Sequence, residues 1–196
     1  MSSHLPLDGV VLARHGETDD NLEPLRFQGF RDTPLNDTGR SQAASLAERL
    51  AAAEPFGTSW QSIGSLWTSD LSRARETADI IGTRIGLQAK SDRRLREGNR
   101  GRWEGHTFAE IETTEPDLYA AWRRAGAQFR FPGGESLLEQ QQRVTEALTE
   151  IHEVGDLPAV AVCHGGCIRV MLCLSDPRGL DAFHEFEIPN VAVVPL

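Results

Sequence analysis

The sequence predicts an α/β fold built on a mainly parallel sheet. Short apolar runs, each bounded by glycine or polar residues, are typical of buried strands. Longer segments between them carry the apolar periodicity of about 3.6 residues that indicates helices. Because strand-like and helix-like segments alternate along the chain, the helices are expected to cross over between parallel strands. A chain of 196 residues is expected to form one domain, 1–196, with residues 1–8 as an N-terminal lead.

Four apolar runs are the candidate strands. The runs at 9–13, 65–69 and 159–163 are expected to be buried. A fourth run, at 191–195, is expected at an edge of the sheet.

Helical patterns fill the segments between these strands. Residues 38–54 are rich in Ala, Leu, Glu and Arg, and the pattern at 72–86 stops at a glycine. The segment 106–126 predicts two shorter helices separated at Pro116, and 167–174 predicts another helix.

The clearest helix is predicted at 136–155. Ser136 and Glu139 have the spacing of a capping box at its start. The apolar stripe that should face the core is expected to contain Leu137, Gln141, Val144, Leu148 and Ile151.

Composition narrows the classes of function. The formal net charge of −9 argues against a general nucleic-acid binder, which needs a basic face. No apolar run approaches the roughly 20 residues that span a bilayer, and the start "MSSHLPLDG" lacks the features of a signal peptide. An odd number of clustered cysteines is not a disulfide framework, so a reducing, cytoplasmic setting is expected; they are Cys163, Cys167 and Cys173.

Cationic or imidazole side chains follow three of the predicted strands. Arg14 and His15 come directly after the first, Arg73 lies a few residues beyond the second, and His164 comes directly after the third. Ligands of open α/β sheets bind beyond the carboxyl ends of the strands. These four side chains are therefore expected to converge on one crevice.

Such a cluster suits a phosphate dianion. Guanidinium groups present fixed forks of donors that match phosphate oxygens. Glycines after each histidine, among them Gly165, let backbone N–H groups approach an anion closely. The helix expected to follow Gly166 adds a favourable dipole.

An uncharged imidazole at this site can attack phosphorus and form a phosphohistidine. Neighbouring cations disfavour protonation, which keeps His15 in its nucleophilic form. The departing alkoxide needs a proton, and "LREGNRGRWEG" offers Glu97 and Glu104. Glu97 is preferred because it precedes a glycine-rich turn that can hold it at the pocket edge. A carboxyl that faces bound phosphate is expected to have a raised pKa and to stay protonated.

Six segments, in order from residue 9 to about residue 195, resemble the histidine phosphatase superfamily, which includes the cofactor-dependent phosphoglycerate mutases. They are "LARHGETDDN", "FQGFRDTPLNDTGRSQA", "TSDLSRARETA", "LREGNRGRWEG", "FPGGES" and "VCHGGCIR". Any one of these matches is weak, but six in the family's order are highly specific. The resemblance implies a three-layer α/β sandwich with a central, mostly parallel sheet and helices on both faces. It also implies phosphoryl transfer through His15 without a metal or other cofactor.

The resemblance assigns roles to individual residues. It implies that Arg14, Asn21 and Arg73, rather than Arg75, bind the phosphoryl group. It gives Glu97 as the proton donor and His164 as the second histidine, and it makes Gln28 and Gly29 candidates for substrate binding. The sequence departs from the family pattern at Asp19 and Asp20, where an aromatic residue is common before the asparagine, and at Arg100, where an aromatic or aliphatic residue is common. These departures bear on which substrate is bound and leave the residues of the phosphoryl transfer unchanged.

The favoured function is a phosphatase that acts on a small phosphorylated metabolite through a phosphohistidine. A phosphoglycerate mutase that depends on 2,3-bisphosphoglycerate is the alternative within the superfamily. Two readings from other classes stay open: a metal hydrolase that uses His164, Cys163 and Cys167, and a non-catalytic module that binds phosphorylated ligands. Nucleic acid and membrane are not expected as partners, and a homodimer is possible.

The segment 104–135 is the plausible lid over the substrate. One hypothesis is that an arginine in it, Arg123, Arg124 or Arg130, reads a second anionic group such as a carboxylate. The preferred interpretation is a solvated helix face with Trp122 packed beneath it.

Overall fold

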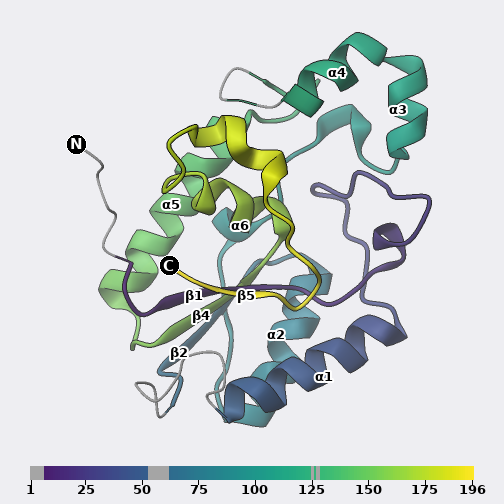
Figure 1. Cartoon of the computed structure of the whole chain (residues 1–196). Coiled ribbons are helices and arrows are strands. Elements are labelled where there is room, and N and C mark those ends of the chain that lie inside the picture. Colours follow the sequence, from purple (N-terminus) through teal and green to yellow (C-terminus); the bar gives the residue numbers. More distant parts are fainter. Residues whose placement is uncertain (1–6, 53–61, 125, 127–128) are drawn as a thin grey trace.

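A five-stranded sheet runs through the centre of the molecule (Figure 1). The computed structural model describes residues 7–52, 62–124, 126 and 129–196. The strands lie in the order β3-β2-β4-β1-β5. Their bounds are β1 (Val10–Arg14), β2 (Ser65–Thr68), β3 (Lys90–Ser91), β4 (Ala159–Cys163) and β5 (Val193–Pro195). The first four are mutually parallel, and β5 pairs antiparallel with β1 at the edge, as expected for the last run.

Helices cover both faces of this sheet, so the three-layer arrangement is present. Figure 1 shows α1 (Asp37–Ala51) and α2 (Ser72–Ile85) below the sheet and α5 (Leu137–Val154) and α6 (Gly165–Leu172) above it. Successive residues of β1 face opposite sides, as the strand period of two requires. Val11 and Ala13 pack in the cluster with α1 and α2, whereas Val10 and Leu12 pack in the cluster with α5 and α6.

Local signals fix where the helices begin and end. Asn36 caps α1 by accepting a hydrogen bond from the amide of Gly39 at 2.8 Å. Ser136 and Glu139 form the predicted capping box at the start of α5. Gly86 ends α2 with φ of +77°, in the left-handed region that glycine adopts at little cost.

The predicted stripe on α5 is wrong at one position. Gln140, and not Gln141, is the fully buried glutamine of this helix. Gln141 is half-buried and donates a hydrogen bond to the carbonyl of Val170 at 2.6 Å. Two adjacent glutamines give no apolar signal that separates them, and the buried one is selected by a partner from a distant segment, described below.

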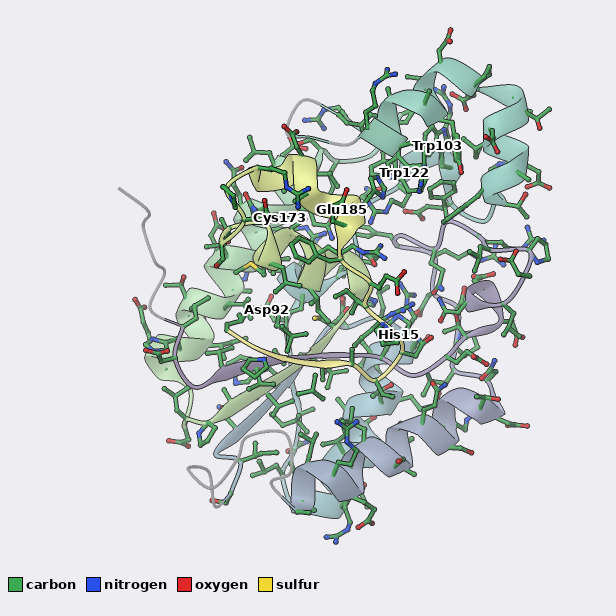
Figure 2. The ribbon with its side chains drawn as sticks, in the orientation of Figure 1. His15, Asp92, Trp103, Trp122, Cys173 and Glu185 are labelled. Atoms are coloured by element: carbon green, nitrogen blue, oxygen red, sulfur yellow. The ribbon has the colours of Figure 1, made fainter. Side chains whose placement is uncertain are left out.

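The two short helices predicted around Pro116 are α3 (Phe108–Thr114) and α4 (Pro116–Arg124). Pro116 is the first residue of α4, where its missing N–H costs no helical hydrogen bond. Figure 2 shows Trp103 and Trp122 close together beside these helices. Their rings belong to an aromatic cluster in which Trp122 meets Phe27 and Phe108 edge-on, with ring centroids 4.9 Å and 5.4 Å away.

Parts of the predicted lead and lid lie outside the described residues. Residues 1–6 of the lead do so, and its Leu7 is buried in the cluster under α5 and α6. Residues 125, 127 and 128 of the segment 104–135 also lie outside. Within the part of the chain that is described, no helix has both the length and the apolar character needed to cross a bilayer.

Candidate active site

A cavity of about 310 Å³ lies where the carboxyl ends of β1 and β4 meet the aromatic cluster. Most of the residues that the sequence singled out line it: Arg14, His15, Asn21, Gln28, Gly29, Arg73, Glu97 and Gly165. The ring of His164 lies directly behind them, 5.1 Å from the ring of His15 between centroids. The expected convergence of distant segments on one crevice is therefore observed.

His15 is held as a buried, neutral imidazole. Its Nδ1 lies 2.6 Å from the carbonyl oxygen of Gly16. Because a carbonyl oxygen only accepts, Nδ1 carries the hydrogen in the neutral ring and the lone pair resides on Nε2. Burial, reinforced by Arg73, His164 and Arg14, lowers the pKa of His15 well below its ordinary value of 6.5.

His164 is fully buried beside it. Its Nε2 shares a hydrogen bond of 2.9 Å with the hydroxyl of Ser69, which follows β2. Its Nδ1 has no hydrogen-bond partner among the described residues. Burial and the nearby arginines, Arg73 first among them, lower the pKa of His164 well below 6.5, so this ring is also neutral at pH 7.

Two arginines are fixed by backbone carbonyls. Arg73 donates from Nη1 to the carbonyl of Arg31 at 2.8 Å and from Nη2 to that of Gly29 at 3.0 Å. Arg14 donates from Nη1 to the carbonyl of Ile188 at 2.6 Å. Burial lowers the pKa of Arg14 to about 10, so its guanidinium still carries a charge at pH 7. These groups present fixed cations to an anion in the cavity.

Gly29 has a conformational role in this arrangement. Its φ is +55°, and a Cβ built on it would lie 2.2 Å from Oε1 of Glu104. A glycine is therefore required to bring its carbonyl to Arg73. Glu104, the second candidate for the proton donor, instead accepts hydrogen bonds from the amides of Phe30 and Arg100 at 2.8 Å and 3.0 Å and does not line the cavity.

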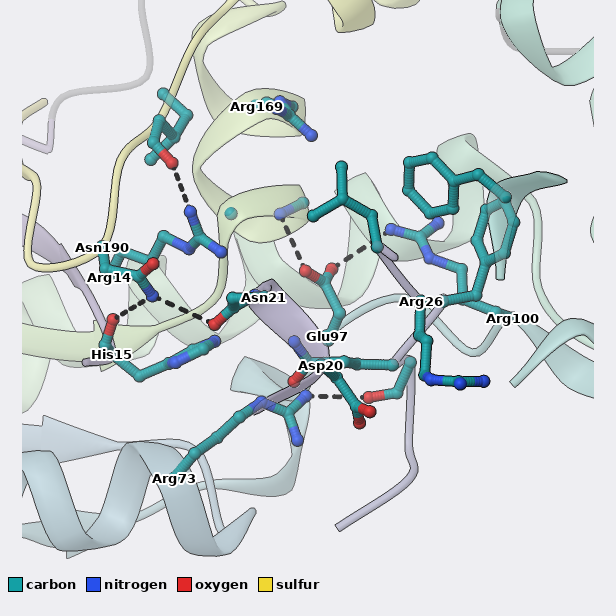
Figure 3. A pocket seen from close by; sticks show the side chains of 18 of the residues that line it. Arg14, His15, Asp20, Asn21, Arg26, Arg73, Glu97, Arg100, Arg169 and Asn190 are labelled. Atoms are coloured by element: carbon teal, nitrogen blue, oxygen red, sulfur yellow. Dashed lines mark hydrogen bonds and ion pairs between the residues drawn. The ribbon is translucent and has the colours of Figure 1, made fainter. Parts of the chain in front are cut away.

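Asn21 is oriented by the hydrogen bonds that its side-chain oxygen, Oδ1, accepts. The amide and the hydroxyl of Thr18 donate to Oδ1 at 3.0 Å and 3.2 Å, and Nδ2 of Asn190 donates to it at 3.3 Å. With Oδ1 occupied, the NH₂ group of Asn21 is the part free to donate to a ligand. Asn190 also donates to the carbonyl of His15 at 3.1 Å, and Figure 3 shows it between His15 and Asn21.

Glu97 lies in the cavity wall with its carboxylate held at both oxygens. Oε2 accepts from the amide of Gly166 at 2.9 Å. Oε1 accepts from the amide of Gly98 at 2.7 Å and from Nε2 of Gln140 at 3.0 Å. It also accepts from Nη2 of Arg100 at 3.3 Å, and Figure 3 shows this pair. A Cβ on Gly166 would come within 2.1 Å of Oε1, so any larger residue at this second position of α6 would displace the Glu97 carboxylate.

The protein's own groups act on the pKa of Glu97 in opposite directions. Burial by itself would raise the pKa, but the Arg100 charge and the amides of Gly166 and Gly98 outweigh burial and lower it to about 2. The protein groups around Glu97 therefore favour the carboxylate. A bound phosphate dianion acts in the opposite direction, because like charge disfavours ionisation.

Sequence reasoning missed several residues that shape this site. Ser69, Gln140 and Asn190 bond directly to the predicted residues, and Arg26 and Arg169 line the cavity. No hydrophobic periodicity in the sequence marks these residues, because such a pattern reports burial and not hydrogen bonds between distant side chains. Of the departures from the family pattern, Asp20 and Arg100 both line the cavity, and Asp20 lies 3.5 Å from Nε of Arg31.

The cavity lining does not include Arg123, Arg124 or Arg130 of the segment 104–135. Arg123 and Arg124 are exposed on α4, and Arg130 pairs with Glu139 at the surface. Trp122 is buried beneath α4 and lines the cavity. This arrangement agrees with the preferred interpretation, in which a solvated helix face packs over Trp122.

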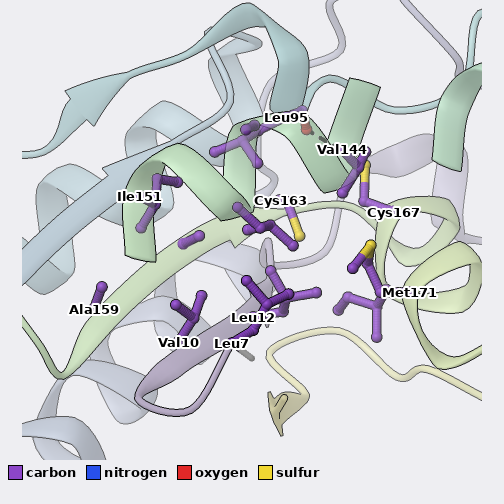
Figure 4. Packing of buried hydrophobic residues seen from close by; sticks show 14 of the residues in the cluster. Leu7, Val10, Leu12, Leu95, Val144, Ile151, Ala159, Cys163, Cys167 and Met171 are labelled. Carbon is purple, nitrogen blue, oxygen red and sulfur yellow. Dashed lines mark hydrogen bonds between the residues drawn. The ribbon is translucent and has the colours of Figure 1, made fainter. Parts of the chain in front are cut away.

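Cys163 and Cys167 lie in the hydrophobic cluster under α5 and α6 rather than in the cavity (Figure 4). Sγ of Cys167 is 3.0 Å from the carbonyl of Arg96. Burial raises the pKa of Cys163 well above its ordinary value. Among the described residues, no group of three or more His, Cys, Asp or Glu side chains is placed to hold a metal ion.

Comparisons with known proteins agree with this architecture. The family model of the histidine phosphatase superfamily (branch 1) matches residues 10–196. The chain is 38% identical over 171 residues to glucosyl-3-phosphoglycerate phosphatase of Mycobacterium tuberculosis, across 83% of this chain and 72% of that protein. It is 38% identical over 185 residues to the probable phosphoglycerate mutase GpmB of Escherichia fergusonii, across 90% of this chain and 77% of that protein.

A solved structure shows the same fold. The native mycobacterial glucosyl-3-phosphoglycerate phosphatase superposes with a TM-score of 0.77 at 32% identity, covering 94% of this chain and 87% of that one. The chain therefore belongs to the histidine phosphatase superfamily. The predicted α/β fold and the predicted family of phosphatase enzymes are confirmed.

Proposed function

We propose that this protein hydrolyses a small phosphomonoester in two steps, with the phosphoryl group carried on Nε2 of His15. The observation that carries the proposal is the buried, neutral imidazole of His15 in a cavity that also holds the charged guanidinium groups of Arg14 and Arg73. A phosphoryl group in flight spreads negative charge over its equatorial oxygens, and fixed cations stabilise that charge. Asn21 and His164 complete the set of groups proposed to hold it.

In the first step, Nε2 of His15 attacks phosphorus and the bond to the leaving oxygen breaks. Glu97, protonated when the substrate dianion is bound, donates its proton to that oxygen, and the alcohol leaves. In the second step, the Glu97 carboxylate takes a proton from water while the water oxygen attacks phosphorus. The N–P bond breaks, inorganic phosphate departs, and both side chains return to their starting states.

A small metabolite is the proposed substrate class. The cavity of about 310 Å³ is at the lower end of the range for small-molecule sites. The relative from Mycobacterium tuberculosis is named for a phosphorylated sugar derivative, which supports the same class. Gln28 and Gly165 are proposed to contact this substrate, since both line the cavity.

The mutase remains the second candidate because one of the similar proteins is named a probable phosphoglycerate mutase. A mutase must keep its phosphohistidine away from water while the intermediate turns over in the site. Incubation with 3-phosphoglycerate, with released phosphate and formed isomer both quantified, separates the two functions. We expect phosphate release to dominate.

The test of the mechanism is to trap the phosphohistidine. Rapid quenching with a ³²P-labelled monoester should label the protein in an acid-labile, base-stable linkage at His15. His15→Ala should lose the label and lower kcat by roughly 10³-fold or more, as loss of a nucleophile does. His106→Ala, which alters a histidine with a 56% exposed side chain outside the cavity, is the matched control and should retain both. Substantial turnover by pure His15→Ala protein would refute the mechanism.

Two finer points belong to the same proposal. A reducing, cytoplasmic compartment is supported by Cys163, Cys167 and Cys173, which are all free and buried. The homodimer stays a prediction, and analytical ultracentrifugation tests it directly.

A further inference from the structure

Arg100 is a buried cation in the wall of the cavity. The residue is 8% exposed, and its guanidinium stacks over the ring of Phe131 at 4.4 Å. Within the described part of the chain, its side chain makes one hydrogen bond, from Nη2 to Oε1 of Glu97 at 3.3 Å, and Nη1 has no partner. A buried guanidinium with most of its five donors unused is costly unless another acceptor serves it.

The net charge of the cavity walls also indicates that a second anionic acceptor is bound there. Its walls carry five arginines, at positions 14, 26, 73, 100 and 169, and two carboxylates, those of Asp20 and Glu97. With His15 neutral, three positive charges are in excess. A phosphate monoester brings a charge of about −1.5 to −2 at pH 7. At least one positive charge therefore remains for another part of the substrate, and protonation of Glu97 adds a second.

The position of Arg100 shows which part of the substrate that is. Arg100 bonds to the carboxyl group that is proposed to protonate the leaving oxygen. Two hydrogen bonds and the span of the carboxyl group between them reach about 8 Å, so its guanidinium lies within that distance of the leaving oxygen. The atoms found there are the first carbons of the leaving alcohol and the groups they carry. Phosphoryl oxygens are served by Arg14 and Arg73.

We propose that Arg100 is a specificity-determining residue that binds a carboxylate on the leaving alcohol, close to the phosphoester. A carboxylate fits because its negative charge offsets part of this excess and because its two oxygens match the planar fork of a guanidinium. The inference rests on the proposed phosphatase function and names its substrate class: phosphorylated hydroxy acids. The carboxylate recognition that one hypothesis gave to an arginine of the segment 104–135 is assigned here to Arg100, a residue of the glycine-rich turn after Glu97.

The test compares two esters that differ only in this group. 3-Phosphoglycerate carries a carboxylate where glycerol 3-phosphate carries a hydroxymethyl group. A hydrogen bond to a charged group predicts that kcat/KM of the wild type favours 3-phosphoglycerate by about tenfold to a hundredfold. Arg100→Leu should bring the ratio close to one, and Arg100→Lys should retain part of it. The ratio is the readout because any effect of Arg100 on Glu97 applies to both esters.

Arg124→Leu is the matched control, since it removes the same charge from an exposed position on α4 and should keep the wild-type ratio. A wild type that does not distinguish the two esters, or a ratio that Arg100→Leu leaves unchanged, overturns the proposal. If either ester is turned over too slowly, the ratio of their competitive inhibition constants against p-nitrophenyl phosphate gives the same comparison. Release of phosphate from p-nitrophenyl phosphate with no discrimination leaves the phosphatase function standing, whereas no hydrolysis of any ester refutes both proposals.

Discussion

The imidazole rings of His15 and His164 lie 5.1 Å apart, centroid to centroid, at the ends of two neighbouring parallel strands. The residues before them, Arg14 and Cys163, are direct partners in the β1–β4 pair. The distance between the rings is thus set by backbone pairing in the middle of the sheet. A slip of one residue would turn one ring to the opposite face, because side chains alternate along a strand.

Glu97→Gln is expected to impair esters according to their leaving groups. The amide cannot donate a proton to the departing oxygen, so kcat for an alkyl phosphate should fall by roughly 10²–10⁴. p-Nitrophenyl phosphate, whose leaving group needs no proton, should be affected far less in the first step. Plots of rate against leaving-group pKa measure this difference. Glu104→Gln should affect both esters alike, and an equal loss for both in Glu97→Gln would contradict the acid role.

Gly166→Ala is expected to damage catalysis more than Gly165→Ala. A methyl group at position 166 would lie 2.1 Å from Oε1 of Glu97 and 2.8 Å from Nη2 of Arg100. At position 165 the nearest atom would be Nε of Arg14 at 3.5 Å, an ordinary contact. We expect Gly166→Ala to lower kcat/KM by at least about tenfold through displacement of Glu97. Equal activities for the two variants would show that the close approach at Gly166 is not required.

Arg143 is expected to stabilise the segment that carries Glu97. Its guanidinium donates to the carbonyls of Arg94, Arg96 and Glu97, at 2.7 Å, 2.7 Å and 2.8 Å, and it pairs with Glu135. Arg143→Met leaves these partly buried acceptors unsatisfied and should lower the free energy of unfolding by about 3–5 kcal/mol.

Urea denaturation measures the effect of Arg143→Met. Arg130→Met removes an arginine from an exposed pair with Glu139 and should cost no more than about 1 kcal/mol. If the two variants lose the same free energy of unfolding, the buried network around Arg143 adds no more stability than an exposed ion pair.

Stability is expected to fall as the pH drops below 6.5. The folded-state pKa values of His15 and His164 lie well below the ordinary value of 6.5, so the unfolded chain binds more protons in that range. The free energy of unfolding therefore rises with pH up to about 6.5 and is flat above it with respect to these groups. Each histidine contributes a slope of up to about 1.4 kcal/mol per pH unit.

Below pH 4.5, Glu97 adds to the loss of stability, because its pKa is about 2 in the folded protein and 4.5 ordinarily. Chemical denaturation between pH 4 and 8 measures the slope. His15→Gln should make it shallower, and an unchanged slope would mean that His15 is not buried in its neutral form.

The sequence predicted the parts of the molecule that depend on local pattern. Apolar runs located β1, β2, β4 and β5, and the rule that parallel strands end at one edge brought Arg14, His15, Arg73 and His164 together. β3 has only two residues, both exposed, and gives no apolar signal. It forms because Lys90 and Ser91 pair with β2 after α2 has placed them there.

The missed residues of the site share a physical reason. Gln140 bonds to Glu97 across 43 positions of the chain, and Asn190 bonds to Asn21 across 169. Such contacts arise from the packing of α5 and of the C-terminal loop, and neither propensity nor spacing encodes them. The amide and arginine donors that lower the pKa of Glu97 likewise come from the fold.

The two histidines stand on the central strands, whereas Trp122 and Phe108 come from a peripheral pair of short helices. Amides in the middle of a sheet exchange with solvent only when the whole molecule opens, and peripheral elements open on their own at lower cost. Hydrogen exchange should accordingly be slowest in β1 and β4 and faster in α3 and α4. Phe108 and Trp122 line the same cavity as His15. Substitutions at these two positions should therefore reshape the cavity wall while the spacing of the two histidines, set by the central strands, stays unchanged.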